Sequence, residues 1–312
     1  MPSTPAAPVV AAKSTPAKPE AAQSPALSSR DVMLQDAYRA EERKDFASAL
    51  ALYTSAADQG SDQAHYELAR IYAQSQPQDL VASNQHLIRA SELGNAEATR
   101  VLAWQYLRGA GVEKDAVKAA SLFDKAAESS VRAQREAGML YANAFVGYPL
   151  NDNAKGLQYL RSATAAGDAE AAFYLYQNLT QSGVATPESD SAMVLAIQKE
   201  YPKALFVAGG FAMKKGKYEQ ASQVYLKAAM RGDADSMYAY ANNVLLKRFP
   251  SSDRELEAYT WFSIAADKQH QESMNELKAQ QGLKKMLERT QPGRLDNMIS
   301  QTKLLIQPWQ SN

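Results

Sequence analysis

The stretch RGAGVEKDAVK, residues 108–118, is the first candidate for chemistry, because a glycine-rich loop that opens a helix can bind phosphate through backbone amides. A phosphate loop usually follows a strand and carries a lysine next to serine or threonine where the helix begins. Here no strand-like segment precedes the loop, and Asp115 stands where it would cap the next helix and repel an anion. We therefore interpret Gly109-Ala110-Gly111 as a turn and predict no cofactor there.

Histidines are the next candidates, as ligands of a metal ion. His65, His86 and His270 do not pair at a spacing of four residues, and they are far apart along the chain. We expect them not to converge and predict no metal site. The chain has no cysteine, so disulfides, thiolate zinc sites and a cysteine nucleophile are excluded.

Serine and carboxylate chemistry has little support in the sequence. No serine lies in a Gly-x-Ser-x-Gly motif, and the acidic residues are expected on solvated helix faces. We predict no catalytic residue and no enzyme. Two distant carboxylates could still meet in space, so a hydrolase of cell-wall polymer stays open as an alternative.

Composition limits the possible partners. Lysine and arginine (34) balance aspartate and glutamate (34), so the strong positive charge typical of nucleic-acid binders is missing. No run of about 18 apolar residues occurs, so we predict no transmembrane segment. Of the 312 residues, 46% are hydrophobic, which is ample for a folded body.

The first 29 residues differ from the rest. They are almost wholly proline, alanine, serine, threonine and lysine, without an aromatic residue. Such a segment buries too little apolar surface to order itself, so residues 1–29 are predicted to be a disordered tether. No signal peptide is recognisable in it; membrane tethering through a leader or lipid anchor that precedes it is a further expectation.

The elements that must position any site are repeats. From residue 31 the pattern AAxxG recurs at a period of 32 to 37 residues, with copies that end near positions 60, 94, 130, 167, 200, 232 and 269. This is the length of a helix-turn-helix repeat. Four residues after most of these junctions stands a small residue, which allows two helices to pack closely; these residues are Ala64, Ala98, Ala171, Ala204, Ser236 and Ser273.

Both helices of each repeat can be recognised in the sequence. ELARIY (67–72) and VLAWQY (101–106) align position by position as first helices. Asp115 is predicted to cap a second helix, VKAASLFDKAA, with equivalents in segments 46–57, 156–166, 218–229 and 256–266. We expect about six such helix pairs over residues 31–269, closed by a helical cap over residues 270–309. The cap would place Leu295, Met298, Ile299 and Leu304 on one face.

Residues 98–130 resemble a Sel1-like repeat, which is related to the tetratricopeptide repeat. The resemblance rests on Ala98, Leu102-Ala103, Tyr106, Gly109, Gly111-Val112, Asp115, Lys118-Ala119, Phe123 and Lys125-Ala126-Ala127. It implies an all-α, right-handed superhelical solenoid of antiparallel helix pairs that assembles proteins. The chain also resembles bacterial envelope scaffolds of the exopolysaccharide (alginate) secretion type.

A set of first-helix residues projects away from the small-residue positions, on the side that lines the concave surface in this class. Several are tyrosine, tryptophan or arginine, which dominate binding hot spots. We predict that this set binds a protein partner: Tyr66, Arg70, Arg100, Trp104, Arg135, Tyr174, Gln177, Tyr238, Asn242 and Asn243.

The predicted function is therefore a non-catalytic scaffold or adaptor with envelope proteins as partners and with no nucleic-acid partner. The expected location is the periplasm or the periplasmic face of the outer membrane. A cytoplasmic adaptor that binds a partner peptide in its groove is the alternative.

Overall fold

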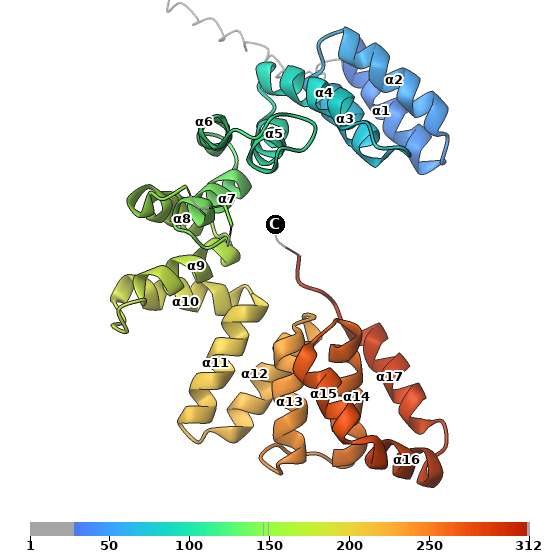
Figure 1. The fold of residues 1–312 in the computed structure, drawn as a ribbon, viewed down its shortest axis with the longest axis vertical. Coiled ribbons are helices and arrows are strands. Elements are labelled where there is room, and N and C mark those ends of the chain that lie inside the picture. Colours follow the sequence, from blue (N-terminus) through green and yellow to red (C-terminus); the bar gives the residue numbers. More distant parts are fainter. Residues whose placement is uncertain (1–27, 146, 149, 311–312) are drawn as a thin grey trace, which may run out of the picture. The chain divides into compact units, whose positions relative to one another are not determined.

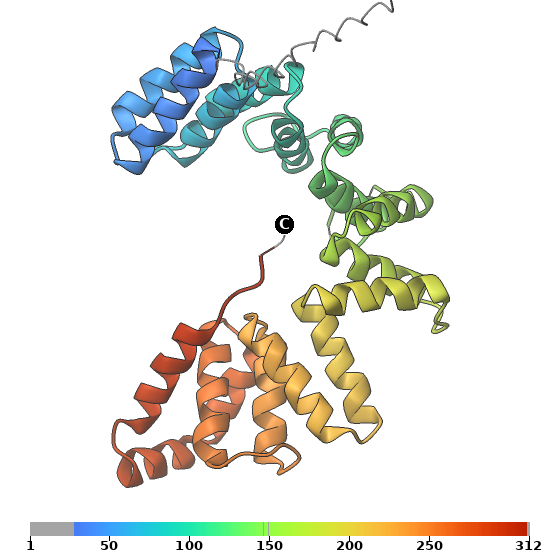
Figure 2. The ribbon, with the colours of Figure 1, turned by 180° about the vertical axis from the view of Figure 1, so that it is seen from behind.

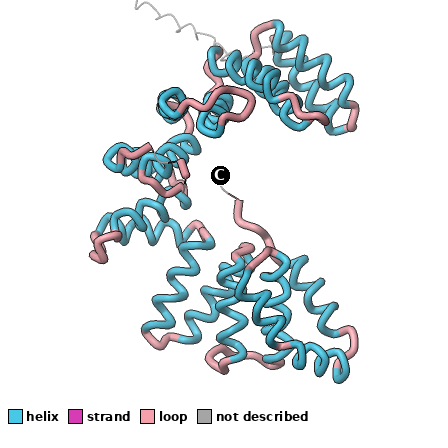
Figure 3. The backbone as a smooth tube through the Cα atoms, in the orientation of Figure 1, coloured by secondary structure: helices cyan, strands magenta, loops and turns pink. Residues whose placement is uncertain are grey.

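The computed structural model describes residues 28–145, 147–148 and 150–310. Throughout this part of the chain the regular structure is α-helix, joined by short loops and without strands (Figure 3). Two compact units divide the chain between Ser61 and Asp62. Residues 1–27, which hold nearly all of the predicted tether, lie outside the described residues.

The first unit contains one helix pair, α1 (Ser29–Glu42) and α2 (Phe46–Asp58). The Ser28 side chain accepts a hydrogen bond from the Asp31 backbone and so caps α1. Within the pair, the Tyr53 hydroxyl donates to the Glu41 carboxylate at 2.8 Å.

The second unit continues with consecutive helix pairs (Figure 1). The pairs are α3 (Asp62–Gln74) with α4 (Leu80–Glu92), α5 (Ala96–Arg108) with α6 (Ala116–Ala127), α7 (Val131–Tyr141) with α8 (Asn153–Ala165), α9 (Ala169–Leu179) with α10 (Pro187–Gln198), α11 (Pro202–Lys214) with α12 (Tyr218–Met230), and α13 (Ala234–Leu245) with α14 (Arg254–Asp267). With α1 and α2 the described chain holds seven pairs, one more than predicted, because the first helix has no repeat junction before it to align.

Side-chain caps explain where many of these helices begin. Asn95, Asp168 and Asp233 each accept a hydrogen bond from the backbone three residues on, at the starts of α5, α9 and α13. Asp115 caps α6 in the same way, as predicted, by accepting from Lys118 N at 2.9 Å.

The repeat junctions share one backbone geometry. Gly60, Gly94, Gly167 and Gly232 have φ between +80° and +100°. At two junctions another residue replaces the glycine, and there Glu200 and Gln269 take the same left-handed conformation (φ +56° and +68°). This conformation costs a residue with a Cβ about 1–2 kcal/mol. Position 130 is the exception, because Ser130 is extended and caps α7 instead.

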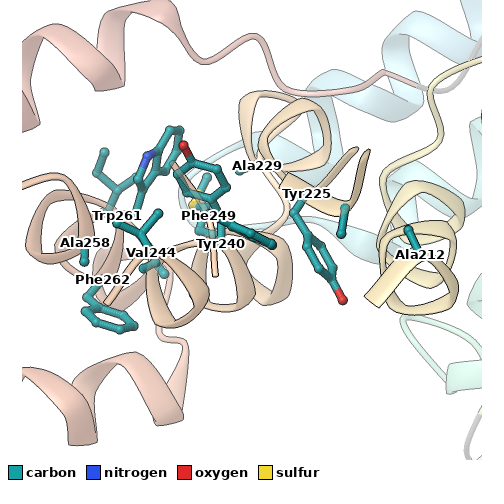
Figure 4. Packing of buried hydrophobic residues seen from close by; sticks show 14 residues of the cluster. Ala212, Tyr225, Ala229, Tyr240, Val244, Phe249, Ala258, Trp261 and Phe262 are labelled. Carbon is teal, nitrogen blue, oxygen red and sulfur yellow. The ribbon is translucent and has the colours of Figure 1, made fainter. Parts of the chain in front are cut away.

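The small residues four positions after the junctions lie where the helices cross. Each of the six is fully buried, at 0% exposure: Ala64, Ala98, Ala171, Ala204, Ser236 and Ser273. Larger side chains fill the space beside them. Figure 4 shows this packing around α13 and α14, where the Tyr240 ring lies 5.7 Å from that of Phe249 and 6.1 Å from that of Trp261.

Three shorter helices follow the last pair: α15 (Gln271–Ala279), α16 (Gln281–Thr290) and α17 (Arg294–Leu305). Leu295 of α17 is buried against Leu256 and Tyr259, and Met298 and Ile299 pack on the same cluster. Leu304, predicted on this face, is instead 85% exposed. It lies at the end of α17, and the chain leaves the helix one residue later.

None of the helices in the described ranges has the length and apolar character that a membrane crossing requires.

Candidate functional site

Arg100, Trp104 and Arg135 are brought together by the structure. They line a cavity of about 400 Å³ between α5, α7 and α9, which we call the Trp104 pocket. Its other lining residues are Val101, Gln105, Arg108, Arg132, Glu136, Met139, Phe145 and Glu170. Because α5, α7 and α9 are first helices of successive repeats, one surface of the solenoid forms this pocket.

The Arg100 guanidinium is locked inside the wall of the pocket. It is 6% exposed and bonds Glu136 of α7 at 2.7 Å and Glu97 of its own helix at 2.6 Å. Burial lowers the pKa of Arg100, but the hydrogen bond to Glu97 and the charge of Glu136 outweigh burial and raise the pKa above its ordinary value. Arg100 therefore stays charged and ties α5 to α7.

Trp104 is held by both polar and aromatic contacts. Its indole N–H donates to the same Glu136 carboxylate, and its ring meets those of Phe123 and Phe145 edge to face at 5.4 and 5.5 Å. The Arg108 guanidinium lies 4.8 Å from the ring centre, where a cation is attracted to the π face. Trp104 is only half-buried, so part of the ring is open to the pocket.

Arg135 forms the far wall. It is 4% exposed and bonds Asp168 at 2.7 Å, with Glu170 at 3.4 Å. Asp168 also caps α9. This ion pair joins α7 to α9 as the Arg100–Glu136 pair joins α5 to α7.

The other predicted residues lie elsewhere in the second unit. Tyr66 is half-buried in α3, where burial, then the charge of Glu97, raises its pKa. Arg70 bonds Glu67 at 2.7 Å. Tyr174 and Gln177 line a different cavity of about 520 Å³, and the Tyr238 ring lies against that of His270, tilted by 33°, with 5.1 Å between ring centres.

The ten predicted residues therefore do not form one site, and three of them are buried. Arg100 and Arg135 are held in interhelical ion pairs. Asn243 is 8% exposed and donates to the Ala239 carbonyl, while Asn242 beside it is half-buried. That these ten residues bind a partner stays a prediction. The expectation that all of them point outward is wrong for the three buried ones, because paired polar groups can be buried at this register.

Several residues of the Trp104 pocket are not among the residues predicted from the sequence, including Arg108, Arg132, Glu136 and Phe145. Glu136 is the most instructive of them. It lies 36 residues after Arg100, about one repeat, so opposite charges at neighbouring register positions of successive repeats were the available signal. The expectation that acidic residues lie on solvated faces is wrong for Glu136, which is 9% exposed.

The expectation that the histidines stay apart is also wrong for one pair. His65 Nδ1 and His86 Nδ1 are 3.0 Å apart, and the His86 ring stacks on Tyr72. Although 21 residues separate them, α3 and α4 form an antiparallel pair, which brings the two positions together. One nitrogen must donate and the other accept, so only one of the two Nδ1 atoms carries a proton. Within the described residues no three His, Cys, Asp or Glu side chains group as metal ligands.

Comparison with known families identifies the repeat. Residues 39–61, 62–95, 96–130, 131–168 and 234–270 match the Sel1 repeat. The match covers more than half of the 312 residues. A search of the curated proteins finds no match.

One solved structure shares the fold at low identity, and two others are similar with lower TM-scores. A Sel1 repeat protein from Oxalobacter formigenes is 19% identical with a TM-score of 0.61, over 75% of this chain and 96% of that one. A protective antigen with an SLR fold, present in uropathogenic Escherichia coli, is 16% identical with a TM-score of 0.39, over 89% of this chain and 77% of that one. Yeast Tom70 is 15% identical with a TM-score of 0.46, over 92% and 63% of the two chains. The protein is thus an all-α repeat solenoid that belongs to the Sel1 repeat family, whose repeats typically mediate protein–protein interactions.

Proposed function

We propose that this protein is a non-catalytic scaffold that binds a protein partner at the Trp104 pocket. The observation that carries the proposal is the lining of that pocket, where a half-buried tryptophan lies beside four arginines from neighbouring repeats. Tryptophan and arginine combine large contact area with polar groups, and they are the residue types that contribute most to binding.

The arginines fall into two groups by their role. Arg100 and Arg135 are buried and paired, so they fix the pocket walls before any partner arrives. Arg108 and Arg132 are exposed, with the Arg132 side chain at 51% exposure. Arg132 contacts Glu97 at 3.4 Å and Glu136 at 3.3 Å, and Arg108 lies over the Trp104 ring. A partner's carboxylates or main-chain carbonyls would bind the exposed sides of these two guanidinium groups. Binding then needs little reordering of the pocket, which favours affinity.

A double substitution that removes both exposed charges tests this role. In affinity capture from the source organism, the variant Arg108→Gln/Arg132→Gln is expected to recover the partner at least about tenfold less than wild type, because a hydrogen bond to a charged group contributes about 1.5–3 kcal/mol. The matched control Lys214→Gln/Lys215→Gln removes the same charge at the far end of α11 and should capture normally. Equal recovery by both variants would count against the proposal.

The location we propose is the bacterial cell envelope, on the periplasmic side, where the scaffold would assemble a complex such as an exopolysaccharide secretion machine. The support is compositional: a cysteine-free chain with a proline- and alanine-rich segment at residues 1–29. Fractionation of cells that express the natural gene decides this point. Recovery with periplasmic or outer-membrane markers supports it, and recovery with cytoplasmic markers favours the adaptor that binds a partner peptide.

A further inference from the structure

The segment that follows α17 lies against the solenoid as an extended peptide. Gln307 N donates to the Met230 carbonyl at 2.9 Å, and Trp309 N donates to the Arg231 carbonyl at 3.0 Å. The donors alternate along the segment, as in a β-strand. Pro308 stands between them, at the position whose N–H is not needed, and its ring restricts φ to a value suited to an extended chain.

The acceptors are carbonyls at the ends of second helices. Met230 is the last residue of α12 and Arg231 its C-cap, so these carbonyls lack partners within the helix. The Trp309 indole N–H donates to the carbonyl of Lys199, the C-cap of α10, at 3.2 Å. The segment therefore bridges the ends of two successive repeats through main-chain acceptors.

One aromatic contact anchors the segment. The Trp309 ring lies 4.9 Å from the ring of Tyr201 at 75° to it, a favourable edge-to-face arrangement. Tyr201 is almost fully buried, and its own neighbours are Phe173 and Glu170 of α9. The anchor on the solenoid is thus rigid, while Trp309 is only half-buried.

The space beside the segment shares one wall residue, Arg135, with the Trp104 pocket. A cavity of about 380 Å³ is lined by residues 307–310 on one side and by Lys199, Arg231, Asp168 and Arg135 on the other. Arg135 also lines the Trp104 pocket. In Figures 1 and 2 the red segment leaves the end of α17 as an extended chain.

We infer that Lys199, Tyr201, Met230 and Arg231 form a binding site for an extended partner segment with a Pro-Trp pair, which the chain's own residues 306–310 occupy until displaced. This inference rests on the proposed function and extends its site. The partner must offer two alternating main-chain N–H donors and an indole, because these make the contacts of the native segment.

The contacts of residues 306–310 hold the segment on the solenoid, and they include the packing of Ile306 and Trp309 on buried clusters. Leu304 and Leu305, which connect the segment to α17, are 85% and 63% exposed, so they do not pack the segment in place. Its attachment to α17 keeps the segment near the site at high effective concentration, which weakens binding of a competing free peptide.

A labelled peptide of residues 303–310, KLLIQPWQ, tests the site by fluorescence anisotropy. It is expected to bind a variant that lacks residues 306–312, and to bind the full chain at least about tenfold more weakly, because the attached segment competes. Two altered peptides should bind the shortened variant at least about tenfold more weakly than KLLIQPWQ. One carries Trp309→Ala, and the other is methylated on the main-chain nitrogen of Trp309.

The full chain carrying Trp309→Ala provides a second protein in which only the anchor is lost. It too should bind KLLIQPWQ more tightly than wild type. Failure of both folded variants to bind KLLIQPWQ, or equal binding of the Trp309→Ala peptide, would overturn the inference. A concentration-dependent dimer of the full chain that disappears on removal of residues 306–312 would also overturn it, since the occupant would be a second copy. Partner capture that depends on Arg108 and Arg132 would survive each of these failures, so the two proposals fail separately.

Discussion

Glu136 is the residue on which the Trp104 pocket depends most, because one carboxylate serves three partners. It accepts hydrogen bonds from the Arg100 guanidinium and the Trp104 indole of the neighbouring repeat, and from the Arg132 guanidinium of its own helix. A buried ion pair gives little net stability, yet removal of one partner leaves the other charge buried and unpaired.

The Glu136→Ala variant is therefore expected to lose about 3–5 kcal/mol of unfolding free energy. Glu136→Gln keeps an acceptor for Trp104 and should lose less. Glu113→Ala changes an exposed carboxylate and should stay within about 0.5 kcal/mol of wild type. Chemical denaturation measures all three, and a loss below about 1 kcal/mol for Glu136→Ala would contradict the assigned role.

The paired histidines predict a pH dependence. Burial lowers the pKa of His86 below its ordinary value of about 6.5, and the charge of His65 lowers the pKa further. Because the folded pKa is lowered, the unfolded chain binds the proton more readily. Stability is then fully present above about pH 6.5 and falls as the pH drops toward the folded pKa.

The measurement is the urea midpoint of wild type and His86→Gln at pH 7.5, 6.5 and 5.5. Wild type should lose stability across this range, and the variant should show a shallower slope because the lowered group is gone. If the urea midpoints of wild type and His86→Gln fall equally with pH, the surroundings of His86 do not oppose its protonation.

Residue type alone predicted part of the site. Trp104, Arg100 and Arg135 were recognisable as candidate binding residues, and they do meet in one pocket. Their burial was not predictable, because the carboxylates that pair with Arg100 and Arg135 lie 36 and 33 residues further along the chain. Which carboxylate pairs with each arginine depends on the stagger between successive repeats. That stagger follows only from the assembled helices.

At the scale of elements, the turn Gly109-Ala110-Gly111 sets how α5 leads into α6. Both glycines have positive φ, at +73° and +70°. The Ala110 carbonyl accepts a hydrogen bond from the Asn84 side chain of α4 at 2.8 Å. A Cβ on Gly111 would lie 2.7 Å from the Leu80 Cβ, so the turn packs tightly on the preceding repeat.

Two glycine substitutions separate backbone strain from crowding. Gly167→Ala meets no atom within 4 Å and should cost only the left-handed strain, about 1–2 kcal/mol. Gly111→Ala adds the overlap with Leu80 and should cost at least about 1 kcal/mol more. Thermal or chemical unfolding measures the difference, and equal losses would show that the turn does not need to pack on α4.

Junctions and caps were the part of the helix pattern most open to prediction, because their chemistry is local. Asp115 capping α6 follows from the side chain and its position alone. The junction before α7 was harder to place, because Ser130 replaces the glycine. The small residue at 0% exposure is Ala133, which lies three residues after the junction instead of four.

At the scale of the whole molecule, the helix pairs of the second unit pack mainly on their neighbours in the chain, as expected of a repeat solenoid. The repeat period therefore predicted the fold class and most of the helix pairs. Residues 169–233 match the fold without matching the Sel1 repeat, because α9 to α12 keep the buried small residues while the loop signature is lost. The extended segment 306–310 was not predictable, since main-chain hydrogen bonds to helix ends leave no side-chain pattern.

The proposed partner site is the Trp104 pocket, which the first helices of successive repeats line. The most direct test places a photo-crosslinking residue, p-benzoylphenylalanine, at exposed Arg108, or at exposed Lys215 beyond the end of α11, in cells of the source organism. We expect a defined crosslinked partner from position 108 and none from position 215. Crosslinking of the same proteins at both positions, or of none at position 108, would contradict it.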